Sequence, residues 1–420
     1  MIGNEEKTYR KIIGSYIRYI RKDESMTLSF VGDILEINKG YLSKIENGET
    51  NITPEKLSKL TEIVDIKFVN DISLLNKSKR FLLELLETHI SMNQIKIKIM
   101  LDSYFLNFSM CKDSPAFFHY LLIELYDKLE VKKDLKKSKE LIKLLDEYFK
   151  DVFDSKEQLF FCLLKAFYYQ YIYQTVTSLK YLKEAEDHYT GINNLNYLGV
   201  IYHRMAVMYF YLNDGFSSYI YGEKARMIFR DTLYFKRLQH LNICIASSLV
   251  LLKKYHEAEE IYQKLLDNLE KEEKELKSLI LNSLIWKSVR AREFENALTY
   301  INRAKEIADI SYYMLEACEP IAHYYLGQKE IALDEINSKL NARASKDYIK
   351  LLLELLRSDI QDNNQTFSRL AKKVKRKIES DENFRFSDIY LQLILSHYER
   401  IDDKDKVIEV QDFIIHHYEK

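Results

Sequence analysis

The feature that most restricts the fold of this chain is an internal repeat with a period of about forty residues. In each copy a small residue comes first, an aromatic or large aliphatic residue usually follows within four positions, and a small or aliphatic residue takes the eighth position. The clearest copies are SLKYLKEA from Ser178, SYIYGEKA from Ser218, AEEIYQKL from Ala258 and ALTYINRA from Ala297, with starts 40, 40 and 39 residues apart. A period of this length predicts pairs of helices that bury one face against the next pair.

The whole chain after Lys79 has the same helical character. Apolar and aromatic residues recur there at every third or fourth position, which is the spacing of amphipathic helices. The 420 residues include only 3 prolines and 10 glycines, too few for the many turns of a β-rich fold. We therefore predict an all-α protein.

The repeat resembles the tetratricopeptide repeat, in which small residues lie where two helices touch and an aromatic residue fills the next layer. Ala206 and Tyr209, followed by Ser218 and Ala225, have that family's spacing. The resemblance implies a right-handed α-solenoid over residues 81–420, with about eight helix pairs and a concave groove lined by the first helix of each pair.

Residues 26–48 carry a different pattern, two short helices joined by a tight turn. Thr27 and Asn38 are the predicted N-caps of these helices. Gly48 ends the second one, because glycine adopts the left-handed conformation without a Cβ clash. This helix-turn-helix pattern predicts that the second helix enters a DNA major groove. The side chains that it would present there are those of Lys39, Tyr41, Ser43 and Lys44.

This region resembles the phage repressor/Cro type of helix-turn-helix domain, also called the xenobiotic-response-element type. Residues 13–21 match that family's first helix, and residues 43–48 match its S-x-I-E-N-G ending. The resemblance implies a five-helix DNA-binding domain over residues 1–68, followed by a linker at 69–80. It also implies an ion pair between an arginine of the first helix and the glutamate of the ending, here Arg21 and Glu46. Where the family usually has a phosphate-gripping glutamine, this chain has Leu28.

The predicted DNA contacts are local, because the net charge of the whole chain is only −1. Residues 7–22, in contrast, carry six basic side chains and no acidic one. Arg18 and the nearby lysines are expected to hold phosphates. The full predicted DNA-binding set is Arg18, Thr27, Asn38, Lys39, Tyr41, Ser43 and Lys44.

The sequence contains no signal of a disulfide-bonded, secreted, membrane-spanning or catalytic protein. The four cysteines are far apart and form no Cys-x-x-Cys pair, which suits small buried side chains in a reducing cytoplasm. No apolar run approaches the roughly eighteen residues of a membrane span, and the N-terminus does not resemble a signal peptide. There is no Walker loop, no G-x-S-x-G and no H-E-x-x-H sequence. We therefore expect a cytoplasmic protein that is not an enzyme and binds no cofactor, metal or membrane.

The concave face of the predicted solenoid is the candidate ligand site. Side-chain amides can pair with a peptide backbone, arginine can hold a carboxylate, and aromatic rings supply apolar area with a polar tip. These residue types gather on the projected first helices, which predicts a short linear peptide as ligand. Interhelical packing remains the alternative role for any one tyrosine, because tyrosine is common throughout the chain. The predicted peptide contacts are Tyr171, His203, Arg204, Tyr211, Asn242, Asn282, Trp286 and Arg290.

A Cro-type domain followed by a long tetratricopeptide-like solenoid resembles the RRNPP family, the peptide-pheromone receptors of Gram-positive bacteria. The resemblance implies a cytoplasmic quorum-sensing transcription regulator, a homodimer that binds a double-stranded DNA operator and is switched by a short signalling peptide. Two alternatives share parts of this architecture. One is a Rap-like solenoid that binds or regulates a signalling protein, and the other is a phage regulator of the arbitrium type, which controls lysogeny.

Overall fold

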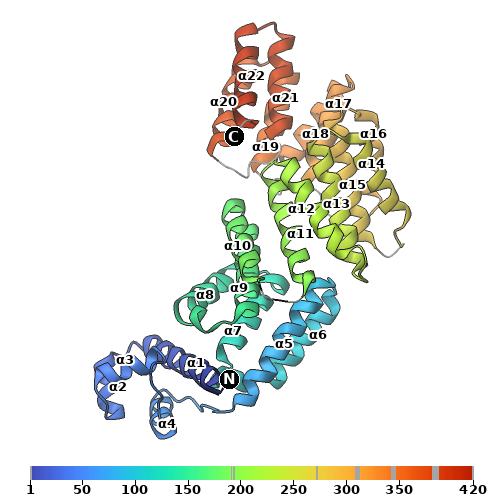
Figure 1. Cartoon of the computed structure of the whole chain (residues 1–420). Coiled ribbons are helices and arrows are strands. Elements are labelled where there is room, and N and C mark those ends of the chain that lie inside the picture. Colours follow the sequence, from blue (N-terminus) through green and yellow to red (C-terminus); the bar gives the residue numbers. More distant parts are fainter. Residues whose placement is uncertain are drawn as a thin grey trace. The chain divides into compact units, whose positions relative to one another are not determined.

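The computed structural model describes residues 2–190, 192, 194–270, 273–307, 313–341, 347–380 and 387–418. Every regular element in these ranges is a helix, which confirms the all-α prediction (Figure 1). No helix among the described residues is both long and apolar enough to span a membrane. The chain separates into two compact units. Unit 1 comprises Met1–Arg204 with Ile228–Arg237, and unit 2 comprises Met205–Met227 with Leu238–Lys420.

Unit 1 begins with the helix-turn-helix domain. Its helices are α1 (Ile2–Asp23), α2 (Leu28–Leu35), α3 (Lys39–Glu46) and α4 (Pro54–Ile63). The apolar positions that recur at helical spacing form one small buried core, made of Ile13, Ile17, Val31, Leu35, Leu42, Ile45, Leu57 and Leu60. Residues 1–68 thus hold four helices where the sequence suggested five.

The fifth helix, α5 (Ile72–Ile90), starts inside the range predicted as a linker. The Asp71 carboxylate accepts a hydrogen bond from the Ser73 amide at 2.8 Å and so caps the helix. Leu74, Ser78 and Leu82 then recur every fourth residue and are buried. The polar residues between them look like a connector in the sequence, but they are the exposed side of an amphipathic helix.

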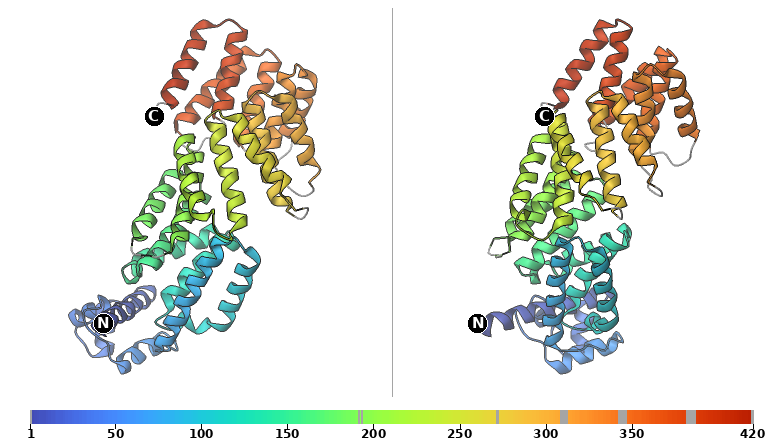
Figure 2. Two further views of the ribbon diagram at one scale, coloured as in Figure 1. Left: turned by 45° about the vertical axis from the view of Figure 1, so that its right-hand side comes forward. Right: turned by 90° about the vertical axis from the view of Figure 1, so that its right-hand side faces the viewer.

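From α5 onward the described helices form nine pairs, one more than the sequence suggested, and Figure 2 shows them from two further directions. Unit 1 contains α5 with α6 (Gln94–Asn107), α7 (Phe117–Tyr126) with α8 (Leu135–Tyr148), and α9 (Ser155–Tyr171) with α10 (Thr175–His188). Three helices are divided between the units, namely α11 (Leu195–Tyr211), α12 (Gly215–Phe229) and α13 (Phe235–Leu251). The remaining helices belong to unit 2: α14 (Tyr255–Asp267), α15 (Lys274–Arg290), α16 (Phe294–Lys305), α17 (Tyr313–Tyr325), α18 (Lys329–Asn341), α19 (Asp347–Ile360), α20 (Asn364–Ser380), α21 (Ser387–Arg400) and α22 (Lys404–Tyr418).

The turn inside each pair contains one residue in the left-handed conformation. In the α11–α12 turn this is Asn213, with φ of 63°. The amide of the next residue, Asp214, donates to the Tyr209 carbonyl at 3.0 Å, which closes the end of α11 as in a Schellman motif. The corresponding residues of the nine turns are Met92, Lys133, Tyr173, Asn213, Lys253, Arg292, Gly327, Asp362 and Asp402. Only one of them is glycine, so these helices end without the glycine signal that sequence reading depends on.

Packing inside the pairs repeats with the predicted period. The Ser178 hydroxyl donates to the Ala166 carbonyl at 2.8 Å, and forty residues later Ser218 donates to Ala206 at the same distance. The small first residue of the repeat therefore lies where two helices touch, as the sequence predicted. An aromatic pair fills the next layer in each case. Tyr169 stacks on Tyr181, and Tyr209 on Tyr221, with ring centroids 5.3 Å apart in both pairs.

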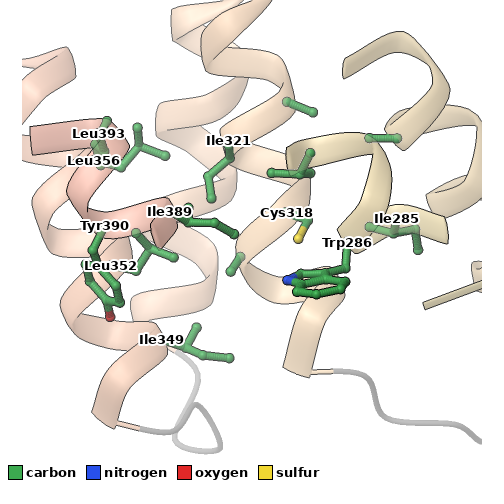
Figure 3. Close-up of a cluster of buried hydrophobic side chains, with 14 of the residues drawn as sticks. Ile285, Trp286, Cys318, Ile321, Ile349, Leu352, Leu356, Ile389, Tyr390 and Leu393 are labelled. Carbon is green, nitrogen blue, oxygen red and sulfur yellow. The ribbon is translucent and has the colours of Figure 1, made fainter. Parts of the chain in front are cut away.

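The core of unit 2 is built from its first helices, among them α15, α17, α19 and α21, and from the apolar sides of their partner helices. Figure 3 shows part of it, with Trp286 and Cys318 near Ile321 and Ile389. With Leu352 of α19, these buried side chains come from four successive helix pairs and share one continuous core.

Candidate functional site

Each of the two helices of the helix-turn-helix begins with a side-chain cap. The Thr27 hydroxyl accepts a hydrogen bond from the Phe30 amide at 3.1 Å, and the Asn38 side chain accepts one from the Tyr41 amide at 2.8 Å. Both residues are therefore the N-caps that the sequence predicted. Gly32 makes the turn possible, because a Cβ there would lie 2.7 Å from the Ile37 carbonyl oxygen.

The predicted base-reading residues gather on one side of α3. Leu42 and Ile45 are buried, whereas Lys39 and Lys44 are exposed. Tyr41 is 41% exposed, and Ser43 is half-buried on the same short helix. Arg18, the predicted phosphate contact, is exposed on α1. The outward side of α3 therefore offers two ammonium groups and two hydroxyls to a partner.

Replacing Lys44 with alanine is expected to weaken binding to a specific DNA site by about 1–3 kcal/mol, if its ammonium group bonds a guanine edge. The measurement is a titration of a fluorescent duplex selected from random sequences. Lys98→Ala is the matched control, because Lys98 is equally exposed but lies on α6. Equal affinities of the parent and Lys44→Ala for specific and random duplexes would remove Lys44 from the interface.

A buried ion pair connects α1 to the end of α3. The Arg21 Nε and Nη2 atoms donate to the two carboxylate oxygens of Glu46 at 2.6 and 2.9 Å. Nη1 donates to the Met26 carbonyl at 2.9 Å, so all three guanidinium nitrogens are engaged. The hydrogen bonds to Glu46 raise the pKa of Arg21, and the guanidinium stays charged. This arrangement confirms the predicted pair and connects α1 to the C-terminal end of α3.

The other side of α1 packs on the repeat domain within unit 1, which the sequence did not predict. Tyr16 and Tyr19 both contact Phe117 of α7, with ring centroids 5.4 and 5.0 Å apart. Tyr19 also meets Tyr148 of α8 edge-on at 5.7 Å. Burial, followed by the nearby Asp23 carboxylate, raises the pKa of Tyr19 to about 12. A single helix therefore belongs both to the core of the DNA-binding domain and to an aromatic contact with the first helix pairs.

Three of the predicted peptide contacts lie in unit 1. The Tyr171 hydroxyl donates to Glu130 at 2.8 Å and accepts from the Lys133 ammonium at 2.7 Å. His203 is buried on α11. Beside it, the Arg204 guanidinium lies 4.4 Å from the centre of the Phe167 ring.

Five predicted peptide contacts lie in unit 2, and three of them share one side of α15 at four-residue spacing. Asn282 has a buried carbonyl oxygen with no hydrogen-bond partner among the described residues. Trp286 is only 9% exposed and lies between Phe210, edge-on at 5.5 Å, and the Arg290 guanidinium at 4.4 Å. The other two, Tyr211 on α11 and Asn242 on α13, are exposed and half-buried respectively.

Arg290 has a partner that the sequence did not reveal. Its Nε lies 2.5 Å from the Asp388 carboxylate of α21, and both side chains are largely buried. Asp388 is almost a hundred residues away along the chain and belongs to the last helix pair. No local spacing signals such a contact, because it depends on how four successive pairs wind.

Among the described residues, Glu319, His323 and Glu335 are the group whose ligand atoms could surround a metal ion. The Glu319 carboxylate, however, accepts hydrogen bonds from the Lys305 ammonium and, at 3.0 Å, from that of Lys339. Two ammonium groups already neutralise this carboxylate. The cluster is therefore an ion-pair network between helices.

Comparison with known proteins agrees with this two-part construction. The helix-turn-helix family matches residues 17–69. The structure is similar to that of a Rap protein complexed with competence and sporulation factor, with a TM-score of 0.69 at 11% identity over 82% of this chain and 98% of the other. It is also similar to NprR in complex with its cognate peptide NprX, with a TM-score of 0.64 at 16% identity over 81% and 98%. The chain therefore has a helix-turn-helix domain and the helical-repeat fold of Rap and NprR.

A further similar structure is aspartyl phosphate phosphatase F from Bacillus subtilis, with a TM-score of 0.52 at 14% identity over 84% of this chain and 94% of the other. No curated protein sequence matches the chain. The similarity to known proteins thus rests on the matched helix-turn-helix domain and on the arrangement of helices.

Proposed function

We propose that this protein is a quorum-sensing transcription regulator that binds operator DNA through α3 and is switched by a short peptide bound to its repeat domain. The observation that carries the proposal is the pairing of a complete helix-turn-helix domain with a repeat domain of the Rap and NprR fold in one chain. A cytoplasmic homodimer belongs to the proposal, because one small reading head makes few base contacts and two heads read two half-sites.

The peptide part of the proposal is supported by polar groups on the first helices. An extended peptide has a full row of backbone donors and acceptors, each of which costs about 1–3 kcal/mol if it is buried without a partner. The carbonyl oxygen of Asn282, which no described residue bonds, is suited to accept a hydrogen bond from such a backbone. We retain Tyr171, His203, Arg204, Tyr211, Asn242, Asn282, Trp286 and Arg290 as the proposed peptide contacts.

The contact of α1 with α7 offers a physical route from the repeat domain to the DNA. Tyr16 and Tyr19 pack on Phe117, while Arg21 on the same helix holds Glu46 at the end of α3. A change in the arrangement of the first helix pairs would therefore move α1 and the reading helix together. The peptide can shift this equilibrium only by binding one arrangement more tightly than the other.

The experiment that tests the proposal exposes genomic fragments to the purified full chain and sequences those that bind. We expect a small set that shares a repeated half-site. The same selection with Lys44→Ala should no longer enrich these fragments. Recovery of the same fragments by both proteins would contradict specific DNA reading through α3.

A Rap-like role is the second candidate, because a Rap protein and a phosphatase are among the similar folds. In that role the repeat domain would bind or regulate a signalling protein. A third possibility is a phage regulator of the arbitrium type. The surroundings of the gene separate these: a tiny neighbouring reading frame with a secretion signal favours a secreted peptide, and phage genes favour control of lysogeny.

A further inference from the structure

The first helices of unit 1 bring two guanidinium groups and one buried imidazole close together beside the ring of Phe167. Phe167 of α9 lies between the imidazole of His89 on α5, stacked at 5.4 Å, and the Arg204 guanidinium of α11 at 4.4 Å. Arg237, at the start of α13, donates to the carbonyl oxygens of His89 and Ile90 at 2.7 and 2.6 Å. Contacts therefore connect residues of four first helices, α5, α9, α11 and α13, in one cluster.

Two polar groups in this cluster have no partner among the described residues. The Nδ1 atom of His89 is 3.0 Å from the Tyr126 hydroxyl, but its Nε2 atom is buried and unbonded, and His89 is only 5% exposed. The Arg204 Nε atom is likewise buried without an acceptor. The Arg204 Nε–H is always a donor, whereas the His89 Nε2 atom is a donor only when Nδ1 accepts the Tyr126 hydroxyl proton. Leaving a guanidinium donor unsatisfied in the interior is costly, so the position of Arg204 points to an acceptor that binds there.

The cluster also has an excess of positive charge. Neither Arg204 nor Arg237 forms an ion pair with a carboxylate of any described residue. Lys133 bonds the Tyr171 hydroxyl at 2.7 Å, and its ammonium lies 4.3 Å above the Tyr171 ring. The nearest acid in this network is Glu130, which Tyr171 bonds at 2.8 Å. In this network one carboxylate, that of Glu130, therefore lies among three basic side chains, those of Lys133, Arg204 and Arg237.

The pKa values of the buried groups reflect the same excess of positive charge. Burial, followed by the charges of Arg237, Arg204 and Lys133, lowers the pKa of His89 well below its usual value. Burial and the Arg204 charge also lower the pKa of Arg237. These side chains destabilise one another's charged forms, and a bound anion would relieve that repulsion.

Capping of α5 explains only part of the cluster. A guanidinium at the C-terminal carbonyls of a helix is favourable, so Arg237 has a structural role at the end of α5. Arg204 bonds no carbonyl or carboxylate of a described residue, and capping gives no reason for it to lie here. The position of Arg204 is explained if its guanidinium binds an acceptor group of a ligand.

We infer that a carboxylate of the peptide ligand binds to Arg204, assisted by Lys133 and by the positive charge of Arg237 behind it. Guanidinium–carboxylate hydrogen bonds are among the strongest in proteins, and a site with surplus positive charge strengthens them further. The inference rests on the proposed function, and it specifies that the peptide carries an essential negative charge. That charge can be its C-terminal carboxylate or an aspartate or glutamate side chain.

The test starts from short random peptides with free C-termini, selected for binding to the immobilised full-length protein. The tightest selected peptide is then measured in solution against the parent, Arg204→Gln and Arg230→Gln. Arg230 is the matched control, because it is an exposed arginine beside Asp231. We expect Arg204→Gln to weaken binding about tenfold to a hundredfold and Arg230→Gln to leave it unchanged.

Two altered peptides identify the carboxylate. One has an amidated C-terminus, and the other has its acidic side chains replaced by amides. We expect one of the two altered peptides to bind the parent about tenfold to a hundredfold more weakly than the original peptide does. That peptide should bind Arg204→Gln almost as well as it binds the parent, because its carboxylate and Arg204 form one pair and either change removes it. Arg204→Lys, which keeps the charge, should retain part of the binding, and thermal unfolding of each variant checks that it is folded.

The outcomes separate the two claims. If the parent binds both altered peptides as tightly as the original, the anion subsite is wrong while peptide binding stands. If no peptide is selected at all, the peptide part of the proposed function fails and the subsite fails with it.

Discussion

Replacing Glu46 with alanine is expected to lower the stability of the DNA-binding domain by about 3–5 kcal/mol. The change leaves the Arg21 guanidinium, only 5% exposed, without the carboxylate that accepts two of its hydrogen bonds. An uncompensated buried charge costs far more than a lost surface pair, whose contribution is typically below about 1 kcal/mol. Amide hydrogen exchange of α3 in the full chain measures this local stability without requiring the whole protein to unfold in one step.

The double variant Arg21→Met/Glu46→Leu separates the ion pair from general packing. It removes both charges and fills the space with apolar atoms, so we expect it to be more stable than Glu46→Ala. Lys59→Ala is a suitable control, because Lys59 pairs with Glu36 at 2.9 Å on the surface of the same domain. A double variant no more stable than Glu46→Ala would count against the ion pair as the clamp between α1 and α3.

Replacing Asn282 with alanine is expected to abolish the response to peptide while DNA binding without peptide stays as in the parent. Asn282 offers a buried carbonyl oxygen that no described residue bonds. If the peptide backbone supplies the missing donor, losing the amide should cost about 1–3 kcal/mol, or roughly fivefold to 150-fold in affinity. Asn296→Ala is the matched control, because Asn296 is an exposed asparagine on the next helix, bonded to Glu293.

Fluorescence of Trp286 provides the readout for this prediction. Trp286 is the only tryptophan of the chain and lies four residues after Asn282 on α15. Its ring contacts Phe210 and the Arg290 guanidinium, so a ligand that disturbs either group should change its emission. Unchanged emission together with equal peptide affinity of the parent and Asn282→Ala would remove this side of α15 from the ligand site.

The parts of the fold that the sequence predicts are those with a local signal. Ser178 and Ser218 mark the period because the closest approach of two helices requires a small side chain, and both make the same hydrogen bond. Thr27 and Asn38 cap helices with their own side chains, and each accepts a hydrogen bond from an amide only three residues further along the chain. The Arg21–Glu46 pair followed from the resemblance of the Ser43–Gly48 ending to a known family, because helix-turn-helix geometry is regular enough to transfer.

The parts that the sequence leaves open depend on distant segments. Tyr16 and Tyr19 look like ordinary apolar positions of α1, and nothing nearby indicates that Phe117 receives them. The sequence predicts Arg290 as a peptide contact, but its ion pair with Asp388 depends on the winding of several helix pairs. The eight proposed peptide contacts are therefore placed on their helices, while their contact with a ligand remains a prediction.

The central claim is that peptide binding and DNA binding are coupled in one molecule. The most direct measurement determines the affinity of the full chain for its selected duplex with and without saturating peptide, and the affinity for the peptide with and without the duplex. The account predicts that both affinities change by the same factor, because a coupling free energy between two sites is reciprocal. A typical coupling of about 1–3 kcal/mol corresponds to a factor of roughly 5 to 150. If both affinities are unchanged although both ligands bind, the protein is not a peptide-switched DNA-binding protein.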